Sequence, residues 1–358
     1  MKQKKSRVLV FLLTGSNYEL SRSEVISVLN AENVNFKILP SSSFIVRAKI
    51  LNNNLGGIVK RAAERLSMSK LIIEEISYLK ISNFQDLLDK IKEINFKFLN
   101  RKKFYVRIFK KHSILSAIKT PELEAAIGAC IIKKTEHTKV SFGNSDVVLA
   151  GIAHDDIFVL GILLKEIKRG YLLKWSPRKR PFFMSSALDV FTSRIMLNLS
   201  ESRKNSVILD PFAGTGGILI DAVKIGCDVV GIDVKPYIAK GCLTNLKHYV
   251  NDEKIMGVIQ CDSLALPLRD NCVSAIVTDP PYGRSSTTLG RDLKTIYSNF
   301  IDEAARILKN KSVLTMLYPS HLSELEKLIA LRFSIEEKYL IRVHKGLVRV
   351  LVKARKVE

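Results

Sequence analysis

The stretch VILDPFAGTGG, residues 207–217, decides the fold of the second half of the chain. VILD is the apolar end of a buried strand, and apolar residues recur at helical spacing after Gly217. Gly214, Gly216 and Gly217 let the backbone turn tightly and approach a ligand at the amino end of that helix. A strand that passes through a glycine-rich turn into a helix is typical of an open α/β sheet, whose ligands bind at the carboxyl ends of the strands.

The same alternation of strands and helices continues from residue 185 to the end of the chain. The predicted strands are SVILD, VVGID, VIQCD, AIVTD and SVLTMLY, and the predicted helices lie at about 186–200, 217–225, 237–249, 293–309 and 320–331. Apolar strands separated in this way predict a parallel, doubly wound sheet. Two closing strands, roughly 334–344 and 347–356, are joined by Lys345-Gly346 and predict a terminal antiparallel hairpin.

The first half of the chain repeats an α/β pattern twice. Residues 7–65 and 70–155 each alternate strands with helices, so two α+β units are predicted ahead of the doubly wound sheet. A segment that mixes basic residues, prolines and aromatics separates them from it. The predicted boundaries are 1–66 and 67–164 for the two units, 165–184 for the linker and 185–358 for the last domain.

Positive charge is concentrated in the first half. The formal net charge is +22, from 57 Lys and Arg against 35 Asp and Glu; residues 1–180 carry +17 of it and residues 181–358 only +5. This asymmetry predicts a module that binds a polyanion such as RNA, although a generally basic proteome would give the same balance. The candidate RNA-binding residues form basic clusters, each of which could equally be a solvated face: Arg101, Lys102, Lys103, Lys110, Lys111, Lys133 and Lys134.

The five cysteines indicate a reducing compartment. They stand at 130, 227, 242, 261 and 272, without a C-x-x-C pair, so neither disulfides nor a metal site are predicted. The early apolar run VLVFLL is short and no cleavage site follows it, so a first strand is predicted rather than a signal peptide. No stretch approaches membrane-spanning length. The sequence therefore predicts a soluble, cytoplasmic protein without a metal.

The glycine-rich turn does not match the loops that bind nucleotide phosphates. No Gly-Lys-Ser/Thr follows it, and Leu219 stands where a dinucleotide fold requires a third glycine or alanine. Asp210, ahead of the glycines, would repel a pyrophosphate but attract a ligand that carries an amino group and a sulfonium. S-adenosylmethionine carries both groups and is the predicted cofactor.

Two further aspartates follow the next two strands. Asp233 is suited to accept both ribose hydroxyls, and Asp262, beside Ser263, can accept the adenine amino group. One such acid is commonly a helix cap, but three at successive strand ends indicate a binding site. The predicted cofactor-binding residues are Asp210, Pro211, Phe212, Ala213, Gly214, Thr215, Gly216, Asp233, Val234, Asp262 and Ser263.

The fourth strand ends in TDPPYGRSS, residues 278–286. Proline lacks the backbone donor, so the strand must stop near Asp279. The exocyclic amine of an aromatic base is a poor nucleophile because its lone pair is delocalised into the ring. The Asp279 carboxylate and the Pro280 carbonyl can accept its two N–H bonds and take up the developing positive charge.

The remaining residues of this motif complete a predicted catalytic group. Pro280 and Pro281 stiffen both acceptors, and Tyr282 can stack on the base. The predicted catalytic residues are Asp279, Pro280, Pro281 and Tyr282. The sequence leaves open whether Asp279 accepts the proton or only orients the amine.

These motifs resemble those of a known family. TDPPY is similar to the D/N-P-P-Y/F/W motif of amino methyltransferases, and the following GRSS narrows the resemblance. Together with DPFAGTGG, RPFF at 180–183 and HKGLVR at 344–349, it makes nearly the whole chain similar to the archaeal tRNA guanosine-10 N2-methyltransferases. The resemblance implies a Rossmann-like class I methyltransferase domain at 185–358, preceded by ferredoxin-like and THUMP domains.

The resemblance also implies a substrate. The THUMP domain would hold the acceptor end of tRNA while one methyl group, then a second, is transferred to N2 of guanosine 10. Because that amine is paired inside a stem, the base is expected to flip onto Tyr282, at a cost of roughly a few kcal/mol. Arg284 is a further candidate contact to phosphate, although a helix cap or a structural salt bridge fits it equally.

Other functions remain open on the sequence. One is guanine-N2 methylation at another tRNA position or in ribosomal RNA. A DNA amino methyltransferase is disfavoured because no helix-turn-helix or zinc pattern is visible. A non-catalytic RNA-binding protein with a retired methyltransferase fold would have lost Asp279 or the glycines, which are present. The predicted partner is tRNA, with no DNA, membrane or obligate protein partner indicated.

Overall fold

The computed structural model describes residues 7–15, 17–52, 54–282, 290, 292–322, 324–344 and 347–357. The chain divides into two compact units. Unit 1 consists of Met1–Val25, Asn33–Glu64 and Met68–Lys168, and unit 2 of Ile26–Glu32, Arg65–Ser67 and Arg169–Glu358. Helix α1 (Tyr18–Ala31) therefore begins in unit 1 and ends in unit 2.

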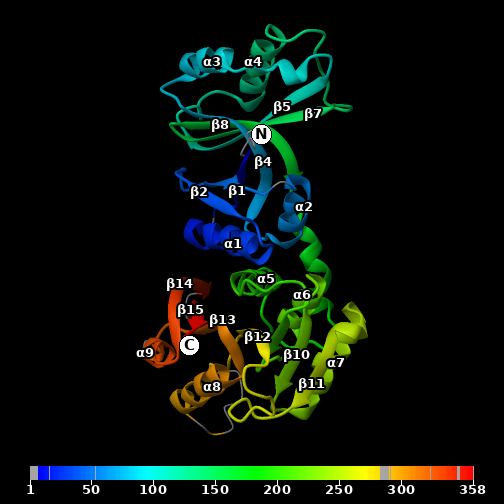
Figure 1. Cartoon of the computed structure of the whole chain (residues 1–358), viewed down its shortest axis with the longest axis vertical. Helices are drawn as coiled ribbons and strands as arrows, with labels where there is room; N and C mark the ends of the chain where they lie inside the picture. The colour runs from blue at the N-terminus through cyan, green and yellow to red at the C-terminus, as the bar shows by residue number, and fades with distance from the viewer. Residues whose placement is uncertain are drawn as a thin grey trace, which may run out of the picture. The chain divides into compact units, whose positions relative to one another are not determined.

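Unit 1 is built on one mixed sheet with the strand order β2-β3-β1-β4-β8-β7-β5-β6 (Figure 1). Its strands are β1 (Arg7–Leu13), β2 (Phe36–Leu39), β3 (Ile45–Ile50), β4 (Ser69–Lys80), β5 (Lys103–Ser113), β6 (Lys139–Val140), β7 (Val147–Asp155) and β8 (Ile157–Glu166). Its other helices are α2 (Leu55–Arg65), α3 (Phe84–Glu93), α4 (Thr120–Ile132) and the 3₁₀ turn η1 (Lys97–Leu99). Strand β5 is parallel to β6 and β7, whereas β4 is antiparallel to both of its neighbours.

This sheet is continuous across the boundary predicted between residues 66 and 67. Strand β4 pairs with β1 on one side and with β8 on the other. One apolar core packs α3 and α4 against β5 and contains Leu87, Ile127 and Phe104. A second core is formed by residues of β1, β3, β4, β7 and β8. The assignment of these two parts to a ferredoxin-like and a THUMP domain remains a prediction.

Unit 2 contains a sheet with the strand order β11-β10-β9-β12-β13-β15-β14. Its strands are β9 (Val207–Asp210), β10 (Asp228–Asp233), β11 (Ile255–Gln260), β12 (Val273–Thr278), β13 (Leu308–Pro319), β14 (Phe333–His344) and β15 (Leu347–Lys356). The first five strands in this order are parallel, and β15 is antiparallel to both β13 and β14. The predicted fold class, a doubly wound sheet that ends in a hairpin, is confirmed. The predicted turn at residues 345 and 346 lies outside the described residues.

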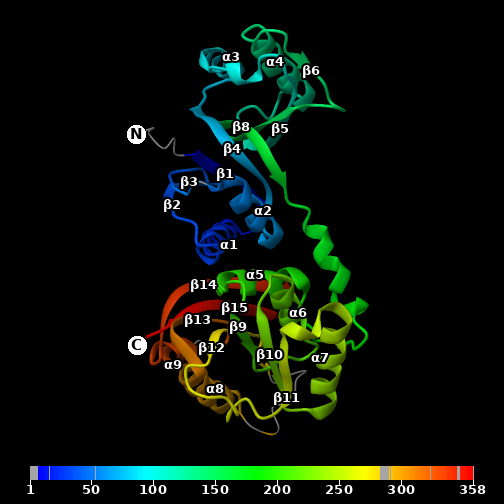
Figure 2. The ribbon, with the colours of Figure 1, turned by 45° about the vertical axis from the view of Figure 1, so that its right-hand side comes forward.

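Helices cover both faces of this sheet (Figure 2). The helices α5 (Val190–Leu199), α6 (Gly217–Lys224) and α7 (Pro236–Tyr249) form one layer, and α8 (Leu293–Ile307) and α9 (Leu325–Ala330) form the other. On the second face, the α8 side chains Tyr297 and Phe300 pack with Val350 and Val352 of β15, all in one buried cluster. Burying each such side chain contributes about 1.5–3 kcal/mol, so this cluster holds the hairpin strand against α8.

Capping side chains decide where two of these helices begin. Asp189 accepts hydrogen bonds from the backbone N–H groups of Phe191 and Thr192, so α5 starts at Val190 rather than near residue 186 as predicted. Asp292 accepts a hydrogen bond from the Thr295 N–H at 3.0 Å, and α8 starts at the predicted position.

The segment that leads into unit 2 packs against its helices. It forms the 3₁₀ turns η2 (Arg169–Trp175) and η3 (Pro177–Lys179). The Trp175 indole N–H donates to Asp221 of α6 at 3.0 Å, and Arg194 of α5 pairs with the same carboxylate at 2.9 Å. All three side chains are buried. Residues from Arg169 onward are therefore part of unit 2, although the predicted range of the linker began at 165.

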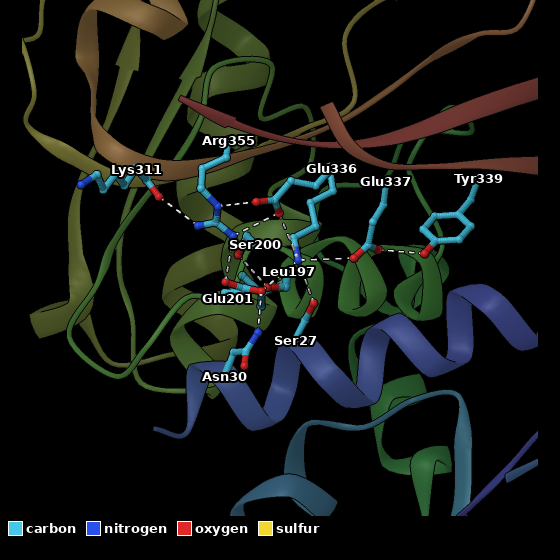
Figure 3. A network of polar contacts seen from close by, with 11 residues as sticks. Ser27, Asn30, Leu197, Ser200, Glu201, Lys311, Glu336, Glu337, Tyr339 and Arg355 are labelled. Atoms are coloured by element: carbon cyan, nitrogen blue, oxygen red, sulfur yellow. Dashed lines mark hydrogen bonds and ion pairs between the residues drawn. The ribbon is translucent and has the colours of Figure 1, made fainter. Parts of the chain in front are cut away.

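A buried cation fixes the hairpin of unit 2, and its partners Glu201, Glu336 and Glu337 are labelled in Figure 3. The Lys353 ammonium of β15 is 4% exposed and lies 2.9 Å from a carboxylate oxygen of Glu201, just after α5. It lies 3.5 Å from Glu336 and 3.6 Å from Glu337, both on β14, and donates to the Ser27 hydroxyl of α1 at 3.2 Å. These contacts join β15, β14, α5 and the last turns of α1 inside unit 2.

Candidate active site

Four aspartates lie at one edge of the unit 2 sheet. Asp210 and Asp233 are the last residues of β9 and β10, Asp279 directly follows β12, and Asp262 follows β11 by two residues. These four strands are neighbours and run parallel, so their carboxyl ends meet at the same edge. The sheet thus brings together the cofactor-binding and catalytic acids predicted from the sequence.

The glycine-rich turn after β9 holds one of these acids in place. Gly214 has a φ of +51° and donates its N–H to Asp233 Oδ2 at 3.2 Å. Gly216 has a φ of +77° and directly precedes α6, and a Cβ there would lie 2.8 Å from Cys242 Sγ. Both the backbone conformation and the space therefore require glycine at 216. Pro211, by contrast, is simply buried in the same turn.

Asp210 lies beneath this turn and is 2% exposed. Its Oδ1 accepts the Thr278 hydroxyl at 2.8 Å and the Phe212 N–H at 3.2 Å. Burial, together with the nearby carboxylates of Asp279 and Asp233, raises the pKa of Asp210 to about 7 against the opposing effect of these hydrogen bonds. A cationic ligand at this edge would favour the ionised acid.

The other two cofactor candidates are held by backbone donors. Asp233 is half-buried and accepts the Lys235 N–H at 3.0 Å; burial raises its pKa, while the bonds from Lys235 and Gly214 oppose this. Asp262 accepts the Leu264 N–H at 3.1 Å. Ser263 beside it is buried. Each carboxylate oxygen retains acceptor capacity after one such bond, so both acids could still bind ribose or adenine.

Sequence reasoning assigned no role to the residues that brace the glycine-rich turn. Arg180 is buried and donates to the Thr215 hydroxyl at 2.6 Å. Asn245 of α7 exchanges hydrogen bonds of 2.8 Å with the backbone of Phe182 and donates to the Thr215 carbonyl at 2.9 Å. The Phe182 ring packs against Gly241, where a Cβ would lie 2.3 Å from ring atoms. The contacts of the RPFF segment therefore hold the turn against α7.

The DPPY motif extends beyond the sheet edge from β12. Pro280 is buried, and its carbonyl accepts no hydrogen bond from any residue in the described part of the chain. The Pro281 carbonyl accepts the Tyr297 hydroxyl of α8 at 3.4 Å. The Tyr282 hydroxyl donates to Asp279 Oδ1. The backbone of the motif is therefore braced from α8, while one of the two proposed acceptors stays available.

Arg349 of β15 contacts two residues of this motif, and the sequence alone indicated no role for it. Its Nη1 lies 3.5 Å from Asp279 Oδ2, and its guanidinium carbon lies 4.8 Å from the centre of the Tyr282 ring. The side chain is 14% exposed. Its buried Nε has no hydrogen-bond partner among the described residues. Arg349 is the last residue of the HKGLVR motif, so the sequence marked this residue. Only the pairing of β15 with β13 brings its side chain to the end of β12.

Burial also controls ionisation at the DPPY motif. It raises the pKa of Asp279 to about 7, against the opposing effect of the Arg349 cation. Burial raises the pKa of Tyr297 well above its ordinary value, and the Asp279 carboxylate adds to this effect. Tyr297 therefore stays a hydrogen-bond donor across the physiological range, whereas Asp279 can exchange a proton near neutral pH.

The candidate RNA-binding lysines and arginines do not all share one environment. Arg101, Lys102 and Lys103 are exposed at the start of β5, and backbone hydrogen bonds pair this segment with residues 136–139. Lys133 and Lys134, also exposed, lie just after α4 on the same connection. The pairing adds one further exposed cation that no sequence motif marked, since Lys139 of β6 is the register partner of Lys103.

Lys110 and Lys111 are placed differently, in the half-buried end of β5. The Lys110 ammonium donates to the carbonyls of Leu115 and Ile118. The Lys111 ammonium donates to the Tyr18 hydroxyl at 2.8 Å. Their charges serve contacts within unit 1, so they do not extend the exposed basic surface. Arg284 lies outside the described residues.

Two absences apply to the described ranges only. Within them, His, Cys, Asp and Glu side chains do not gather in any group of three or more that could hold a metal ion. The helices of the same ranges include none with the length and apolar character needed to span a membrane.

Comparison with known proteins points to one family. Residues 177–351 match the family model described as RMKL-like, methyltransferase domain. The tRNA (guanine(10)-N2)-dimethyltransferase of Methanothermobacter thermautotrophicus is 36% identical over 346 residues, which cover 96% of this chain and 98% of that protein. The protein of the same name from Methanocaldococcus jannaschii is 27% identical and covers 95% of this chain and 97% of its own length.

Solved structures share the fold at low sequence identity. TrmN from Thermus thermophilus matches with a TM-score of 0.54 and 16% identity, covering 98% of this chain and 100% of its own. SMU.472, solved in complex with SAH, matches with a TM-score of 0.51 and 13% identity, and covers 98% of each chain. Both likenesses extend over the two units and concern the fold alone.

Proposed function

We propose, because the chain belongs to the tRNA (guanine(10)-N2)-dimethyltransferase family, that it methylates the exocyclic N2 amine of guanosine 10 in tRNA. The methyl donor is S-adenosylmethionine, and two successive transfers give N2-methyl- and then N2,N2-dimethylguanosine. The observation that carries this proposal is the pair of acceptors after β12, Asp279 and the Pro280 carbonyl, at the sheet edge that also holds Asp210 and Asp233.

The residues at this sheet edge fit S-adenosylmethionine as the methyl donor. A Cβ built on Gly214 would meet nothing closer than the Phe212 carbonyl at 3.9 Å, so the turn leaves open space beside its backbone. The buried Asp210, whose pKa is raised, favours a positively charged ligand and disfavours a phosphate. Asp233 and Asp262 would hold the ribose and the adenine. When bound, S-adenosylmethionine supplies an electrophilic methyl group on a sulfonium.

The DPPY motif would prepare the amine for attack. The two N–H groups of the amine would donate to the Asp279 carboxylate and to the Pro280 carbonyl. These two hydrogen bonds would take the nitrogen lone pair out of conjugation with the ring. The nitrogen lone pair would then be available for the methyl group that bound S-adenosylmethionine would supply, with its sulfur as the leaving group. One proton leaves the nitrogen for Asp279 or water. The hydrogen bond from Tyr297 to the Pro281 carbonyl keeps these acceptors in place.

The location of the target amine requires the base to leave its stem. Flipping costs roughly a few kcal/mol, which binding of the tRNA backbone must offset. The exposed cations Arg101, Lys102, Lys103, Lys133 and Lys134 are the candidates for phosphate contacts in unit 1. Because the substrate is tRNA, we place this activity in the cytoplasm.

A transfer assay with three transcripts tests the proposal. The transcripts carry guanosine, inosine or adenosine at position 10, and inosine differs from guanosine only by the missing amino group. Labelled methyl groups are expected in the guanosine transcript alone, and its nuclease digest should contain both methylated guanosines. Label in the inosine transcript would move the target to another nucleotide. Absence of label from all three would favour a non-catalytic RNA-binding protein.

The contribution of the basic surface has its own test. Replacing Lys102 and Lys103 together by alanine should weaken tRNA binding by removing charge near the phosphates. Each lost phosphate contact should reduce the slope of log affinity against log salt by about 1, so a reduction of about 2 is expected. The control replaces Lys309 and Lys311, exposed lysines of β13. An equal reduction in the control would mean that unit 1 holds no preferred surface.

A further inference from the structure

Both oxygens of the Asp279 carboxylate are already engaged by the chain itself. The Tyr282 hydroxyl donates to Oδ1, and Arg349 lies 3.5 Å from Oδ2. The same guanidinium covers the Tyr282 ring at 4.8 Å from its centre. An incoming aromatic amine would need this carboxylate and this ring face, and in the present arrangement Arg349 holds part of both.

The chemistry of the two competitors is closely matched. In guanine, the N1–H, the carbon C2 and the N2 amine form a planar guanidine unit with its N–H bonds along one edge. The arginine side chain ends in the same planar unit, with N–H bonds suited to a carboxylate and a face suited to an aromatic ring. The contacts that Arg349 makes with Asp279 and Tyr282 are therefore those that the target edge of guanine would make.

We propose that Arg349 is a placeholder for the target guanine: its guanidinium occupies the base position in the free protein and withdraws as the flipped base enters. This inference rests on the proposed function, since it concerns the same site. It gives Arg349 a positioning role, because the residue acts through Asp279 and Tyr282 and touches no reacting atom once the base is bound.

The contacts of Arg349 suit a group that must leave. Its nitrogen-to-oxygen distance of 3.5 Å is longer than the 2.7–2.9 Å typical of a charge-assisted hydrogen bond, so little is lost when it separates. Its Nε is buried without a partner in the described part of the chain, and withdrawal toward water would relieve that. The Pro280 carbonyl accepts no hydrogen bond from the residues that the structure describes, so the base would gain an acceptor that the arginine does not use.

Exchange of the base for the arginine also prepares the charge of the site. While Arg349 is in place, its cation stabilises the ionised carboxylate of Asp279. When the neutral base replaces it at a pH above the Asp279 pKa, the carboxylate is left facing an amine that is about to gain positive charge. The interaction thus strengthens in the transition state, which is the condition for accelerating the transfer.

The placeholder predicts that an added guanidinium ion can complement an alanine variant. Arg349→Ala should bind methylguanidinium at millimolar concentration, detected by calorimetry and by a rise in melting temperature, whereas the native chain should not. This readout needs neither tRNA nor turnover, so it stands even if the target nucleotide is a different one. Arg342→Ala, which removes an exposed arginine of β14, is the matched control and should bind no methylguanidinium.

Kinetics give a second, independent readout. The assay is run well above the pKa of Asp279, so that the carboxylate is ionised in every variant. Removing an intramolecular competitor raises the fraction of competent sites, so Arg349→Ala should lower the KM for tRNA roughly three- to tenfold with kcat within about twofold. Methylguanidinium should then inhibit this variant competitively with tRNA.

A variant that keeps the aliphatic stem covers the case in which the alanine chain does not fold. Arg349→Met removes the guanidinium but retains packing over Tyr282, and its KM should also fall. A rise in KM in either variant would show that Arg349 binds the RNA, and would overturn the placeholder. Unchanged KM together with absence of methylguanidinium binding would overturn it as well.

Discussion

Two cations on the same face of β15 behave in opposite ways. Arg349 and Lys353 are four residues apart, which places both side chains on one side of the strand. Lys353 is surrounded by Ser27, Glu201 and the two acids of β14, at 2.9–3.6 Å. Among the described residues, Arg349 has one carboxylate partner, Asp279, at 3.5 Å.

The difference separates an anchor from a movable group. Burial alone would raise the pKa of Glu201, but its interactions with Lys353, Asn30 and Arg355 outweigh burial and lower it. That cluster is mutually satisfied. Four residues earlier on the same strand, Arg349 lies 3.5 Å from Asp279. This one cation does not offset burial, which raises the pKa of Asp279 to about 7. The ion pairs of Lys353 therefore hold β15 in place, whereas the weaker pairing of Arg349 leaves Asp279 able to accept the substrate.

Removing the Asp279 carboxylate should have the largest effect. Asp279→Ala is expected to lower the rate of methyl transfer by about 10²- to 10⁴-fold, because a positioned acceptor for the amine protons is lost. Binding of S-adenosylmethionine, followed by calorimetry, should be retained. Asp302→Ala, an exposed acid of α8, is the control. Activity within tenfold of the native chain would remove the role assigned to this carboxylate.

The anchor is tested by Lys353→Met. Loss of the ammonium removes the cation shared by three carboxylates, of which Glu201 and Glu336 keep Arg355 as a partner. The free energy of unfolding should therefore fall by about 3 kcal/mol, the lower end of the cost of breaking a buried ion pair, measured by urea denaturation. Lys338→Met removes an exposed lysine of β14 that pairs with Glu326, and should change stability by less than about 1 kcal/mol. Equal effects of the two changes would contradict the distinction drawn between anchor and surface.

The dependence of turnover on pH should report the ionisation of Asp279. Turnover should fall roughly tenfold per pH unit below the midpoint set by Asp279 and level off above it, because only the ionised acid accepts the amine protons. Burial raises the pKa of Asp279 to about 7 with Arg349 beside it, and withdrawal of that cation would raise it further. Other titratable groups also face this site and contribute to its electrostatics: Asp210, Tyr282, Tyr297 and Arg349.

Because the Asp210 and Asp279 carboxyl groups interact, the midpoint belongs to both of them. The profile is measured on single-turnover rates with saturating tRNA. In Asp210→Asn a midpoint that stays close to that of the native chain would identify Asp279 as the main titrating group. A flat native profile from pH 5 to 9 would contradict the assignment of an ionised acceptor.

The smallest effect is expected from Arg349→Met on stability. Its free energy of unfolding at neutral pH should lie within about 1 kcal/mol of the native value, because Asp279 can take up a proton near pH 7 when its cation is removed. The measurement is the urea denaturation used for Lys353→Met. A loss as large as that of Lys353→Met would mean that both cations are anchors.

Local sequence patterns predicted most elements of unit 2. The strands, the glycine-rich turn and the DPPY motif are contiguous in the chain, so periodicity and residue type are enough to find them. The start of α5 was predicted too early, because Asp189 caps the helix and makes it begin at Val190 despite the apolar residues before it. Lys110 and Lys111 were predicted on an exposed surface, but the half-buried end of β5 directs their ammonium groups to partners within unit 1.

By itself, the sequence determined the class of fold and the acids at the strand ends, because parallel strands place their carboxyl termini at one edge whatever surrounds them. Only the tertiary structure decided what surrounds Asp279. Arg349 is 70 residues away in the chain and reaches Asp279 through the pairing of β15 with β13. Tyr297 reaches the motif because α8 packs on one face of the sheet. Contacts between such distant segments depend on register and burial, which no local pattern of residues encodes.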